Sequence, residues 1–318
     1  MENLAVKVLK KTREAEGIAS FELASTDGKS LPAFSAGSHI DVQVPGGLTR
    51  QYSLCNDSSE QHRYRIAVLR DPTSRGGSTG MHDAVKEGDV IQISAPRNHF
   101  PLHQAKHTML FAGGIGVTPL LCMAQRLSVI GSDFTLHYCT RSEERTAFRE
   151  EIAASPFASK VIFYFDAGEP AQKLELETLL AQPTADTHIY VCGPSGFIDH
   201  VTNTAQAKGW NKDQVHLEYF GAASQDKSSD GSFEVKIAST GKIYPIAADI
   251  SVTEALKAHG IEILTSCEQG VCGTCITRVL QGEPDHRDMY FSGDEQAKND
   301  QFTPCCSRSK SAVLVLDL

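Results

Sequence analysis

Residues 266–275 read SCEQGVCGTC, and this stretch contains Cys267, Cys272 and Cys275. With Cys305 further along the chain, the spacing is C-x4-C-x2-C followed by a distant fourth cysteine. This is the spacing of plant-type [2Fe-2S] sites. A structural zinc site usually presents two C-x2-C pairs, whereas this stretch holds one such pair after an x4 arm. The stretch therefore predicts a thiolate-bound iron–sulfur cluster.

The fourth ligand has two candidates, because Cys305 and Cys306 are adjacent. Successive residues of an extended chain point to opposite faces, so only one of them should reach the cluster. The spacing alone leaves the choice open. We expect Gly270 and Gly273 to adopt positive φ, which lets the backbone wrap the cluster and brings N–H groups close to the sulfurs.

Composition excludes several classes of protein. The 318 residues are 41% hydrophobic and 22% charged, and no apolar run is long enough to span a bilayer, so a membrane protein and a disordered chain are both excluded. A net charge of -9 argues against a nucleic-acid partner, since phosphate binding needs clustered Lys and Arg. The N-terminus lacks the apolar segment of a signal peptide, so we expect the nine cysteines to lie in a reducing cytoplasm.

Residues 1–104 form the first predicted domain. Short segments with apolar residues at every second position alternate with Gly and Pro, which is typical of a small antiparallel β-barrel. One helix is expected at residues 79–86, with Ser78 as its N-cap. The predicted strands are residues 5–9, 18–23, 39–44, 51–54, 64–69 and 90–94.

Residues 105–224 form the second predicted domain. Apolar strands alternate with helical segments, which is the pattern of a doubly wound α/β sheet with its ligand site at the carboxyl ends of the strands. The predicted strands are 108–112, 135–139, 161–165, 189–192 and 215–219, and the predicted helices are 119–127, 145–154, 174–180 and 197–208.

A third domain is predicted at residues 231–318. Residues 223–232 are small, polar and rich in Gly, Ser and Asp, so they read as a linker. Strands are expected at 233–237, 242–246, 276–280 and 313–316, with a helix at 253–259. The result is a small α+β domain that carries the cysteine cluster.

The tail of the chain carries a family resemblance. Its segments SCEQGVCGTC (266–275), GEPDHRD (282–288), CCSR (305–308) and LVLDL (314–318) resemble the ferredoxin domain of the phthalate dioxygenase reductase-like family, which includes the reductase components of vanillate O-demethylase and carnitine monooxygenase. The resemblance extends over the whole chain in the order flavin, NAD and ferredoxin domains. It implies a β-grasp fold for the third domain and selects Cys305 as the fourth ligand.

Residues 50–53 read RQYS and are similar to the flavin motif of that family. The Arg50 guanidinium can clamp a phosphate, the Tyr52 ring can cover the isoalloxazine, and the Ser53 hydroxyl can donate toward the ring edge where hydride arrives. Without this context, a strand with a surface Arg and a half-buried Tyr would be the simpler interpretation.

A second flavin element is the sequence Arg75-Gly76-Gly77-Ser78, which opens the only helix expected in the first domain. Backbone N–H groups at such a position can bind an anion. An ordinary glycine turn before a capped helix is the alternative. The resemblance implies that this loop holds the terminal phosphate of FMN, and no segment for the AMP half of FAD is evident, so we expect FMN.

Residues 112–119 read AGGIGVTP and lie between the first parallel strand and its helix. Glycines at this point let the backbone approach a pyrophosphate. We therefore assign Gly113, Gly114 and Gly116 to nicotinamide nucleotide binding, and the resemblance places Thr118 near the nicotinamide. The alternative is a packing role for the glycines alone.

Cys192-Gly193-Pro194 ends another strand and resembles the CGP motif beside the nicotinamide. A buried cysteine at a strand end is more often a core residue. We expect Cys192 to shape the pocket and not to act as a nucleophile. Phe220 resembles the aromatic residue that lies near the flavin in the family.

The choice between NADH and NADPH depends on the ends of the second and third strands of the NAD domain. Arg141, Ser142 and Arg145 could bind a 2′-phosphate, which favours NADPH on chemistry alone. Asp166 could accept a hydrogen bond from the adenosine ribose or be a solvated turn residue. The family resemblance favours NADH, and we keep Arg141 and Asp166 as nucleotide-binding candidates.

These motifs together predict an NADH-dependent reductase. Hydride would pass from NADH to FMN, with Ser53, Thr118, Cys192 and Phe220 around the reacting atoms, and single electrons would pass through the cluster. The resemblance implies a Rieske-type oxygenase of aromatic or quaternary-amine catabolism as acceptor. The alternatives are a reductase for a cytochrome or another monooxygenase, and a non-catalytic, redox-sensing iron–sulfur protein.

Overall fold

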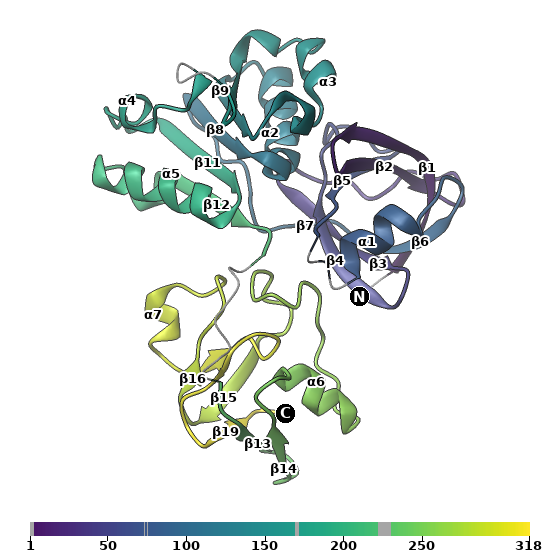
Figure 1. The fold of residues 1–318 in the computed structure, drawn as a ribbon, viewed down its shortest axis with the longest axis vertical. Coiled ribbons are helices and arrows are strands. Elements are labelled where there is room, and N and C mark those ends of the chain that lie inside the picture. Colours follow the sequence, from purple (N-terminus) through teal and green to yellow (C-terminus); the bar gives the residue numbers. More distant parts are fainter. Residues whose placement is uncertain (1–2, 73, 75, 169–171, 222–229) are drawn as a thin grey trace. The chain divides into compact units, whose positions relative to one another are not determined.

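A computed structural model describes residues 3–72, 74, 76–168, 172–221 and 230–318. The chain divides into two compact units, Met1–Phe220 and Gly221–Leu318 (Figure 1). The first two predicted domains thus lie in one unit, and the boundary expected between them at residue 104 stays a prediction. Most of the predicted linker falls outside the described residues. None of the described helices combines the length and apolar character that crossing a bilayer requires.

The first part of unit 1 is an antiparallel sheet in the order β4-β3-β6-β1-β2-β5, with β7 paired to β3. A bridge between Leu54 and Ile66 joins its two ends and closes the sheet into a barrel. Inward-facing residues such as Val8, Phe21 and Ile40 fill the barrel. Its elements are β1 (Asn3–Ala15), β2 (Ile18–Ser25), β3 (Ser38–Val44), β4 (Leu48–Ser53), β5 (Tyr64–Leu69), α1 (Gly77–Asp83), β6 (Val90–Ser94) and β7 (Arg97–Asn98).

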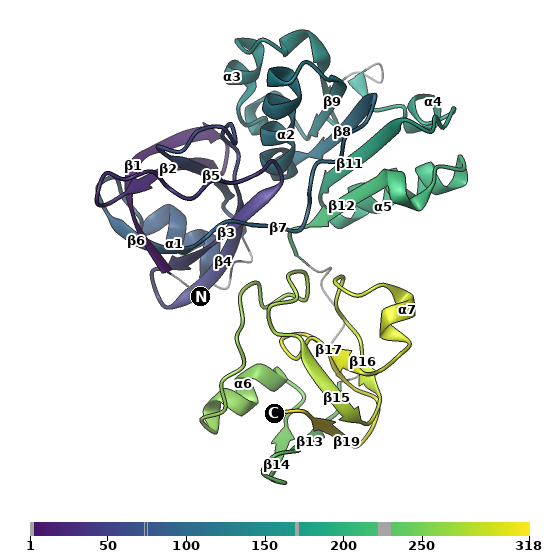
Figure 2. The ribbon, with the colours of Figure 1, turned by 180° about the vertical axis from the view of Figure 1, so that it is seen from behind.

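The second part of unit 1 is a parallel sheet in the order β10-β9-β8-β11-β12, which confirms the doubly wound prediction (Figure 2). Its strands are β8 (His107–Gly113), β9 (Asp133–Thr140), β10 (Val161–Phe165), β11 (Thr187–Gly193) and β12 (Val215–Tyr219). Its helices are η1 (Gly114–Gly116), α2 (Val117–Val129), η2 (Glu143–Arg145), α3 (Arg149–Ala153), η3 (Ala158–Lys160), α4 (Leu176–Leu179), α5 (Ser195–Ala207) and η5 (Lys212–Gln214).

Two helix predictions in unit 1 need correction. The N-cap of α1 is Gly76 at φ 105, and Ser78 lies inside the helix, where its hydroxyl accepts a hydrogen bond from the Asp71 N–H. Because a glycine holds the cap position and has no side chain, α1 has no side-chain cap. The helix expected at 145–154 is broken into η2 and α3, because Phe148 adopts φ 59.

Unit 2 is a mixed five-stranded sheet in the order β14-β13-β19-β15-β17, and helix α6 packs its apolar face on it. The Ser251 hydroxyl caps α6, and Glu254 completes the capping box. This arrangement confirms the α+β ferredoxin fold. The elements are β13 (Phe233–Ile237), β14 (Ile243–Ile246), α6 (Val252–Ala258), β15 (Thr277–Gln281), β16 (Pro284–Asp285), α7 (Gly293–Gln296), β17 (Gln301–Phe302), β18 (Arg308–Ser309) and β19 (Val313–Leu316).

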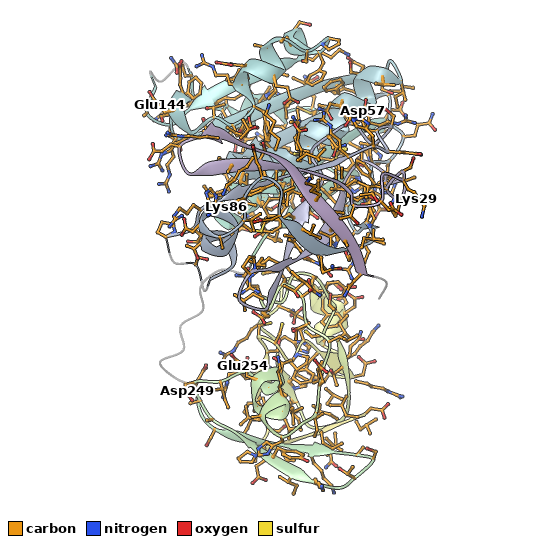
Figure 3. All side chains as sticks on the ribbon, turned by 90° about the vertical axis from the view of Figure 1, so that its right-hand side faces the viewer. Lys29, Asp57, Lys86, Glu144, Asp249 and Glu254 are labelled. Carbon is orange, nitrogen blue, oxygen red and sulfur yellow. The ribbon has the colours of Figure 1, made fainter. Side chains whose placement is uncertain are left out.

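Charged side chains cover the outside of both units. Lys29, Lys86 and Glu144 are exposed on unit 1, and Glu254 is exposed on unit 2 (Figure 3). Within unit 1, the barrel and the parallel sheet share one apolar core, in which Cys55 and Ala67 of the barrel pack with residues of α2 such as Leu120 and Leu121. This shared core brings one edge of the barrel to the glycine loop of the parallel sheet.

Candidate active site and cluster site

The predicted phosphate clamp comes together on strand β4 and helix α1. The side chain of Arg50 packs directly on Gly77, where a Cβ atom would lie 2.8 Å from both Cγ and Nε of Arg50. Gly76 has the left-handed φ that this turn requires. The side chain of Arg50 and the Gly76–Gly77 turn therefore lie next to each other. Arg75 lies outside the described residues.

Tyr52 follows on the same strand and is half-buried. Burial raises the pKa of its phenol to about 12, with the nearby Arg50 charge opposing the rise, so the ring carries no charge at neutral pH. A neutral aromatic ring beside the Arg50 guanidinium suits a flavin, which presents an apolar ring system and a phosphate.

Ser53 ends strand β4 and meets a residue that the motifs did not include. Its buried hydroxyl hydrogen-bonds to the carboxyl group of Glu218 on β12. The Oε2 atom of Glu218 is buried and has no hydrogen-bond partner among the described residues. Burial raises the pKa of this carboxyl to about 8, and the Ser53 hydroxyl only partly opposes the rise. At neutral pH the carboxyl therefore holds its proton.

Glu218 also borders Cys192, because the two residues are register partners on β12 and β11. Burial, together with the Glu218 charge, raises the pKa of the Cys192 thiol well above its usual value. A thiol that keeps its proton is a poor nucleophile, which agrees with the predicted role of shaping the pocket. The sequence carries one signal for Glu218: it is an acidic residue inside the strand VHLEY.

The glycine loop and the CGP loop pack backbone against backbone. A Cβ atom on Gly116 would overlap the carbonyl group of Cys192, and one on Gly193 would lie 2.9 Å from the Cα of Gly113. No side chain fits between these loops, which explains why both are glycine-rich. Gly114 has φ 55, and Pro194 precedes α5.

Thr118 and Phe220 lie at the margins of this group. Thr118 is buried in the first turn of α2, where its hydroxyl donates to the Ile115 carbonyl at 3.0 Å. Phe220 follows β12, two residues after Glu218, and is 39% exposed. Barrel strand β4, the glycine loop, the CGP loop and the end of β12 thus converge around Ser53, Glu218 and Cys192.

The nucleotide-binding candidates lie at the carboxyl ends of the neighbouring strands β9 and β10. The Ala167 N–H donates to the Arg141 carbonyl, and the Asp166 N–H donates to the Thr140 carbonyl, so the two strand ends are joined. Arg141 and Asp166 are exposed. Arg145 already forms an ion pair with Glu16 at 2.9 Å, which reduces its availability for a 2′-phosphate.

The four predicted cluster cysteines converge in unit 2. The Cys305 thiol contacts those of Cys267 and Cys275, and Cys272 contacts Cys267. Hydrogen bonds from Cys272 and Cys305 lower the pKa of Cys267, so the thiolate form is favoured at Cys267. Four converging cysteine thiols are the donor set that an iron–sulfur cluster requires.

Backbone N–H groups surround these sulfurs as expected. The Gln269 N–H donates to Cys267 Sγ at 3.3 Å, and the Thr274 N–H donates to Cys272 Sγ at 3.5 Å. Gly270 and Gly273 have φ 72 and φ 68, as the sequence predicts. Such donors stabilise the negative charge of a reduced cluster.

Cys306 contacts the Cys305 thiol but none of the other three cysteine thiols. Its own thiol lies within 3.3 Å of the Thr303 hydroxyl and near the Ser307 hydroxyl, and it packs on Gly270. These contacts favour Cys305 as the ligand, in agreement with the alternation of neighbouring residues.

Comparisons with known proteins place the chain among flavin and iron–sulfur reductases. Residues 235–310 match the family model of the 2Fe-2S iron-sulfur cluster binding domain, and residues 97–215 match that of the dimethylamine monooxygenase subunit DmmA-like N-terminal domain. The chain is 54% identical to vanillate O-demethylase oxidoreductase of Pseudomonas putida over 98% of each chain, and 46% identical to that of Acinetobacter baylyi over 100% of each. A solved structure of phthalate dioxygenase reductase, described as modular for electron transfer from pyridine nucleotides to [2Fe-2S], is 41% identical with a TM-score of 0.83, covering 99% of this chain and 98% of that one.

The chain belongs to the phthalate dioxygenase reductase-like family. It is an NADH-dependent oxidoreductase that uses FMN and a [2Fe-2S] cluster. The residues present fit these groups: Arg50 with the Gly76–Gly77 turn suits the flavin phosphate, the backbone-to-backbone glycine loops suit the dinucleotide, and the four thiols suit the cluster. The redox-sensing alternative is not supported.

The Gly116→Ala substitution tests the packing of the two loops. The added methyl group overlaps the Cys192 carbonyl, so the loops must separate and NADH binding should weaken about tenfold or more. FMN and cluster absorbance should stay unchanged. Gly196→Ala is the matched control, because its added methyl group meets open space. NADH titration measures the affinity of both variants. Equal affinities would contradict the assignment of Gly116 to nucleotide binding.

The Glu218→Gln substitution tests the protonated carboxyl. Above pH 8 the wild-type carboxyl ionises, and a buried negative charge beside Ser53 opposes the arrival of hydride, so flavin reduction should slow as the pH rises. The Gln variant cannot ionise and should lose this limb of the profile. Because the folded-state pKa of about 8 lies above the ordinary value of 4.5, the free energy of unfolding should fall as the pH rises from 4.5 to about 8 and should change no further from this group above that pH. Stopped-flow flavin reduction between about pH 6 and about pH 10 measures the profile, and an unchanged limb in the variant would assign it to another group.

Two serine variants test the cluster ligands. Cys305→Ser should abolish the visible absorbance of the cluster, because it removes the thiol that contacts Cys267 and Cys275. Cys306→Ser should retain the cluster and serves as the control. Iron content and absorbance measure the outcome, and the reverse result would make Cys306 the ligand.

Proposed function

We propose that this protein is the reductase component of a Rieske-type oxygenase system and that its acceptor is an oxygenase of the vanillate O-demethylase type. The observation that carries the proposal is the end-to-end likeness to oxidoreductases of that name, which leaves no domain of either chain unmatched. The predicted order of functional regions supports it: flavin at residues 1–104, NAD at 105–224 and ferredoxin at 231–318.

The reductase role rests on a conversion of electron number. When bound, FMN accepts the two electrons of a hydride from NADH and releases them singly to the [2Fe-2S] cluster. An oxygenase iron centre accepts single electrons, so such a converter is required between it and NADH. The cofactors carry the chemistry, and the protein supplies position and electrostatics.

Within this reaction we assign roles to the chain's own residues. Arg50, with Arg75 and the Gly76–Gly77 turn, holds the flavin phosphate, and Ser53 donates toward the edge where hydride arrives. The protonated Glu218 carboxyl donates to Ser53 Oγ, which leaves the single Ser53 hydrogen for that edge, and it keeps negative charge away from the edge. The dinucleotide is bound by Gly113, Gly114, Gly116 and Thr118. The nicotinamide pocket is shaped by Cys192, Gly193, Pro194 and Phe220.

The remaining roles concern the two ends of the electron route. Arg141 and Asp166 contact the adenosine half of NADH, and Cys267, Cys272, Cys275 and Cys305 hold the cluster. All nine cysteines are free thiols, which suits the reducing cytoplasm where we place the protein.

An oxygenase-coupled assay tests the proposal. The purified protein is combined with NADH and a vanillate O-demethylase oxygenase, and NADH consumption is measured with and without vanillate, together with the formaldehyde released from the methyl ether. We expect substrate-dependent consumption matched by formaldehyde. A phthalate dioxygenase oxygenase with phthalate is the matched control, and substrate-dependent NADH consumption with it should be slower. Equal or better turnover with phthalate would contradict the vanillate assignment, and no turnover with either oxygenase would contradict the reductase role.

A further inference from the structure

A charged pair lies at the boundary between the barrel and the parallel sheet. Arg65 is the second residue of β5, and its neighbours Tyr64 and Ile66 point into the barrel core. Because side chains alternate along a strand, Arg65 and Ala67 point outward. That face packs on the α/β part of unit 1, where Ala67 belongs to the shared apolar core.

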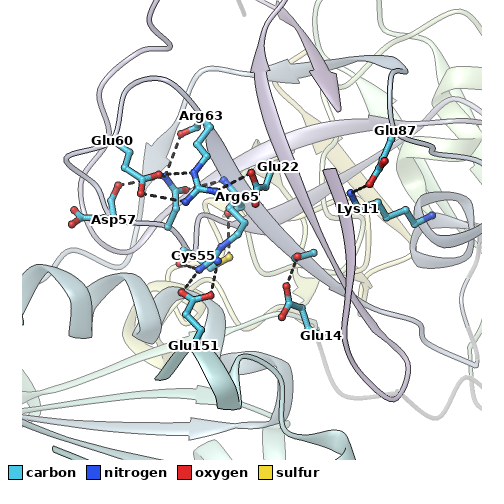
Figure 4. A network of polar contacts seen from close by, with 12 residues as sticks. Lys11, Glu14, Glu22, Cys55, Asp57, Glu60, Arg63, Arg65, Glu87 and Glu151 are labelled. Carbon is cyan, nitrogen blue, oxygen red and sulfur yellow. Dashed lines mark hydrogen bonds and ion pairs between the residues drawn. The ribbon is translucent and has the colours of Figure 1, made fainter. Parts of the chain in front are cut away.

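The guanidinium of Arg65 forms a two-pronged pair with Glu151 of α3. Nη1 donates to Oε2 at 2.6 Å, and Nη2 donates to Oε1 at 2.7 Å (Figure 4). The Arg65 side chain is 10% exposed, whereas that of Glu151 is 38% exposed. The fork geometry fixes orientation as well as distance, which a single contact between point charges does not.

The face of the guanidinium rests on the ring of Phe148, with 5.0 Å between Cζ and the ring centroid. Phe148 is buried and adopts φ 59, a conformation that costs energy for an aromatic residue. Strain of this kind persists where the surroundings enforce it. Here it starts α3 and places the ring against the Arg65 guanidinium.

The pair is hydrogen-bonded to segments on both the flavin side and the nicotinamide side of the active site. On the flavin side, Nη2 of Arg65 also donates to the Cys55 carbonyl at 3.2 Å, and Cys55 lies two residues after Ser53. On the nicotinamide side, Gln125 of α2 donates to Glu151 Oε1 at 3.4 Å, and α2 is the helix that Thr118 opens.

The same segment is joined to the adenosine end of the site. The hydroxyl groups of Thr146 and Thr140 are 2.7 Å apart, and Thr140 ends β9 immediately before Arg141. Glu151 is therefore connected to the end of β9 through the segment from Thr146 to α3. It is connected to the glycine loop through Gln125 of α2. Arg65 is connected to the strand that carries Tyr52 and Ser53.

We propose that the Arg65–Glu151 pair is a positioning device for hydride transfer: it sets the angle of the NAD-binding part against the flavin strand, so that nicotinamide and flavin meet at reacting distance. Neither side chain touches the reacting atoms. The pair acts through Cys55 and Gln125, on groups whose relative placement governs the rate.

Flavin reduction by NADH without any oxygenase tests this proposal, so the outcome is independent of the acceptor proposed above. We expect Arg65→Met to slow flavin reduction at saturating NADH by about ten- to a hundredfold, because a misplacement of about 1 Å can cost that much. FMN content should be unchanged. The long-wavelength absorbance that forms when nicotinamide stacks on flavin should weaken in the same proportion.

Conservative and paired variants separate positioning from mere stability. Arg65→Lys keeps the charge but loses the fork, and should recover part of the rate. Glu151→Gln changes the more exposed partner and should slow reduction in a protein that folds normally. The double variant Arg65→Met/Glu151→Gln should be no slower than Arg65→Met alone, since both remove one interaction.

Two other arginines that form ion pairs provide matched controls. Arg63 pairs with Glu22 and Glu60 inside the barrel, and Arg149 pairs with Glu143 inside the α/β part. Arg63→Met and Arg149→Met should reduce flavin at the wild-type rate. If Arg65→Met and Glu151→Gln reduce flavin at that rate per bound FMN, with stability alone changed, the pair is structural and the proposal is wrong.

Discussion

The apolar core that the barrel shares with the parallel sheet is the constraint on which the active site depends. Flavin and nicotinamide motifs lie on different sheets, and neither sheet forms the site alone. Because Cys55 and Ala67 pack with α2, the end of β4 lies against the glycine loop and β12. Ser53 consequently reaches Glu218, and Glu218 borders Cys192. The Arg65–Glu151 pair crosses the same boundary. Apolar packing holds the two parts together without fixing their orientation, whereas the two hydrogen bonds of this pair do fix it.

The two units have opposite effects on the protonation of their buried acidic groups. In unit 1, burial holds protons on Glu218 and Cys192, so the place where hydride arrives carries no fixed negative charge. In unit 2, neighbouring thiols and backbone N–H groups favour a thiolate at Cys267, which is the state that binds iron. Desolvation dominates the first site and hydrogen bonding to sulfur dominates the second. This division matches a protein that takes in electrons as a pair and releases them singly.

The sequence predicts local features well when a single residue type satisfies a strict requirement. The cysteine spacing, the positive φ of Gly270 and Gly273, and the glycine-rich NAD loop are of this kind. Features that depend on contacts between distant segments are missed. Glu218 and Arg65 look like ordinary strand residues until β12 and α3 are placed against the barrel. The helix expected at 145–154 fails for a similar reason, because the tertiary packing of Phe148 overrides local helix propensity, and the left-handed Gly76 displaces Ser78 from the cap.

The central claim is that electrons enter through the flavin in unit 1 and leave through the cluster in unit 2. Anaerobic rapid mixing with NADH tests it most directly, with flavin and cluster absorbance followed separately. The flavin should be reduced first, with a primary isotope effect when NADH carries deuterium at the transferred position, and the cluster should follow. Protein depleted of flavin should keep its cluster oxidised. Reduction of the cluster by NADH at the same rate in flavin-depleted protein would contradict the account.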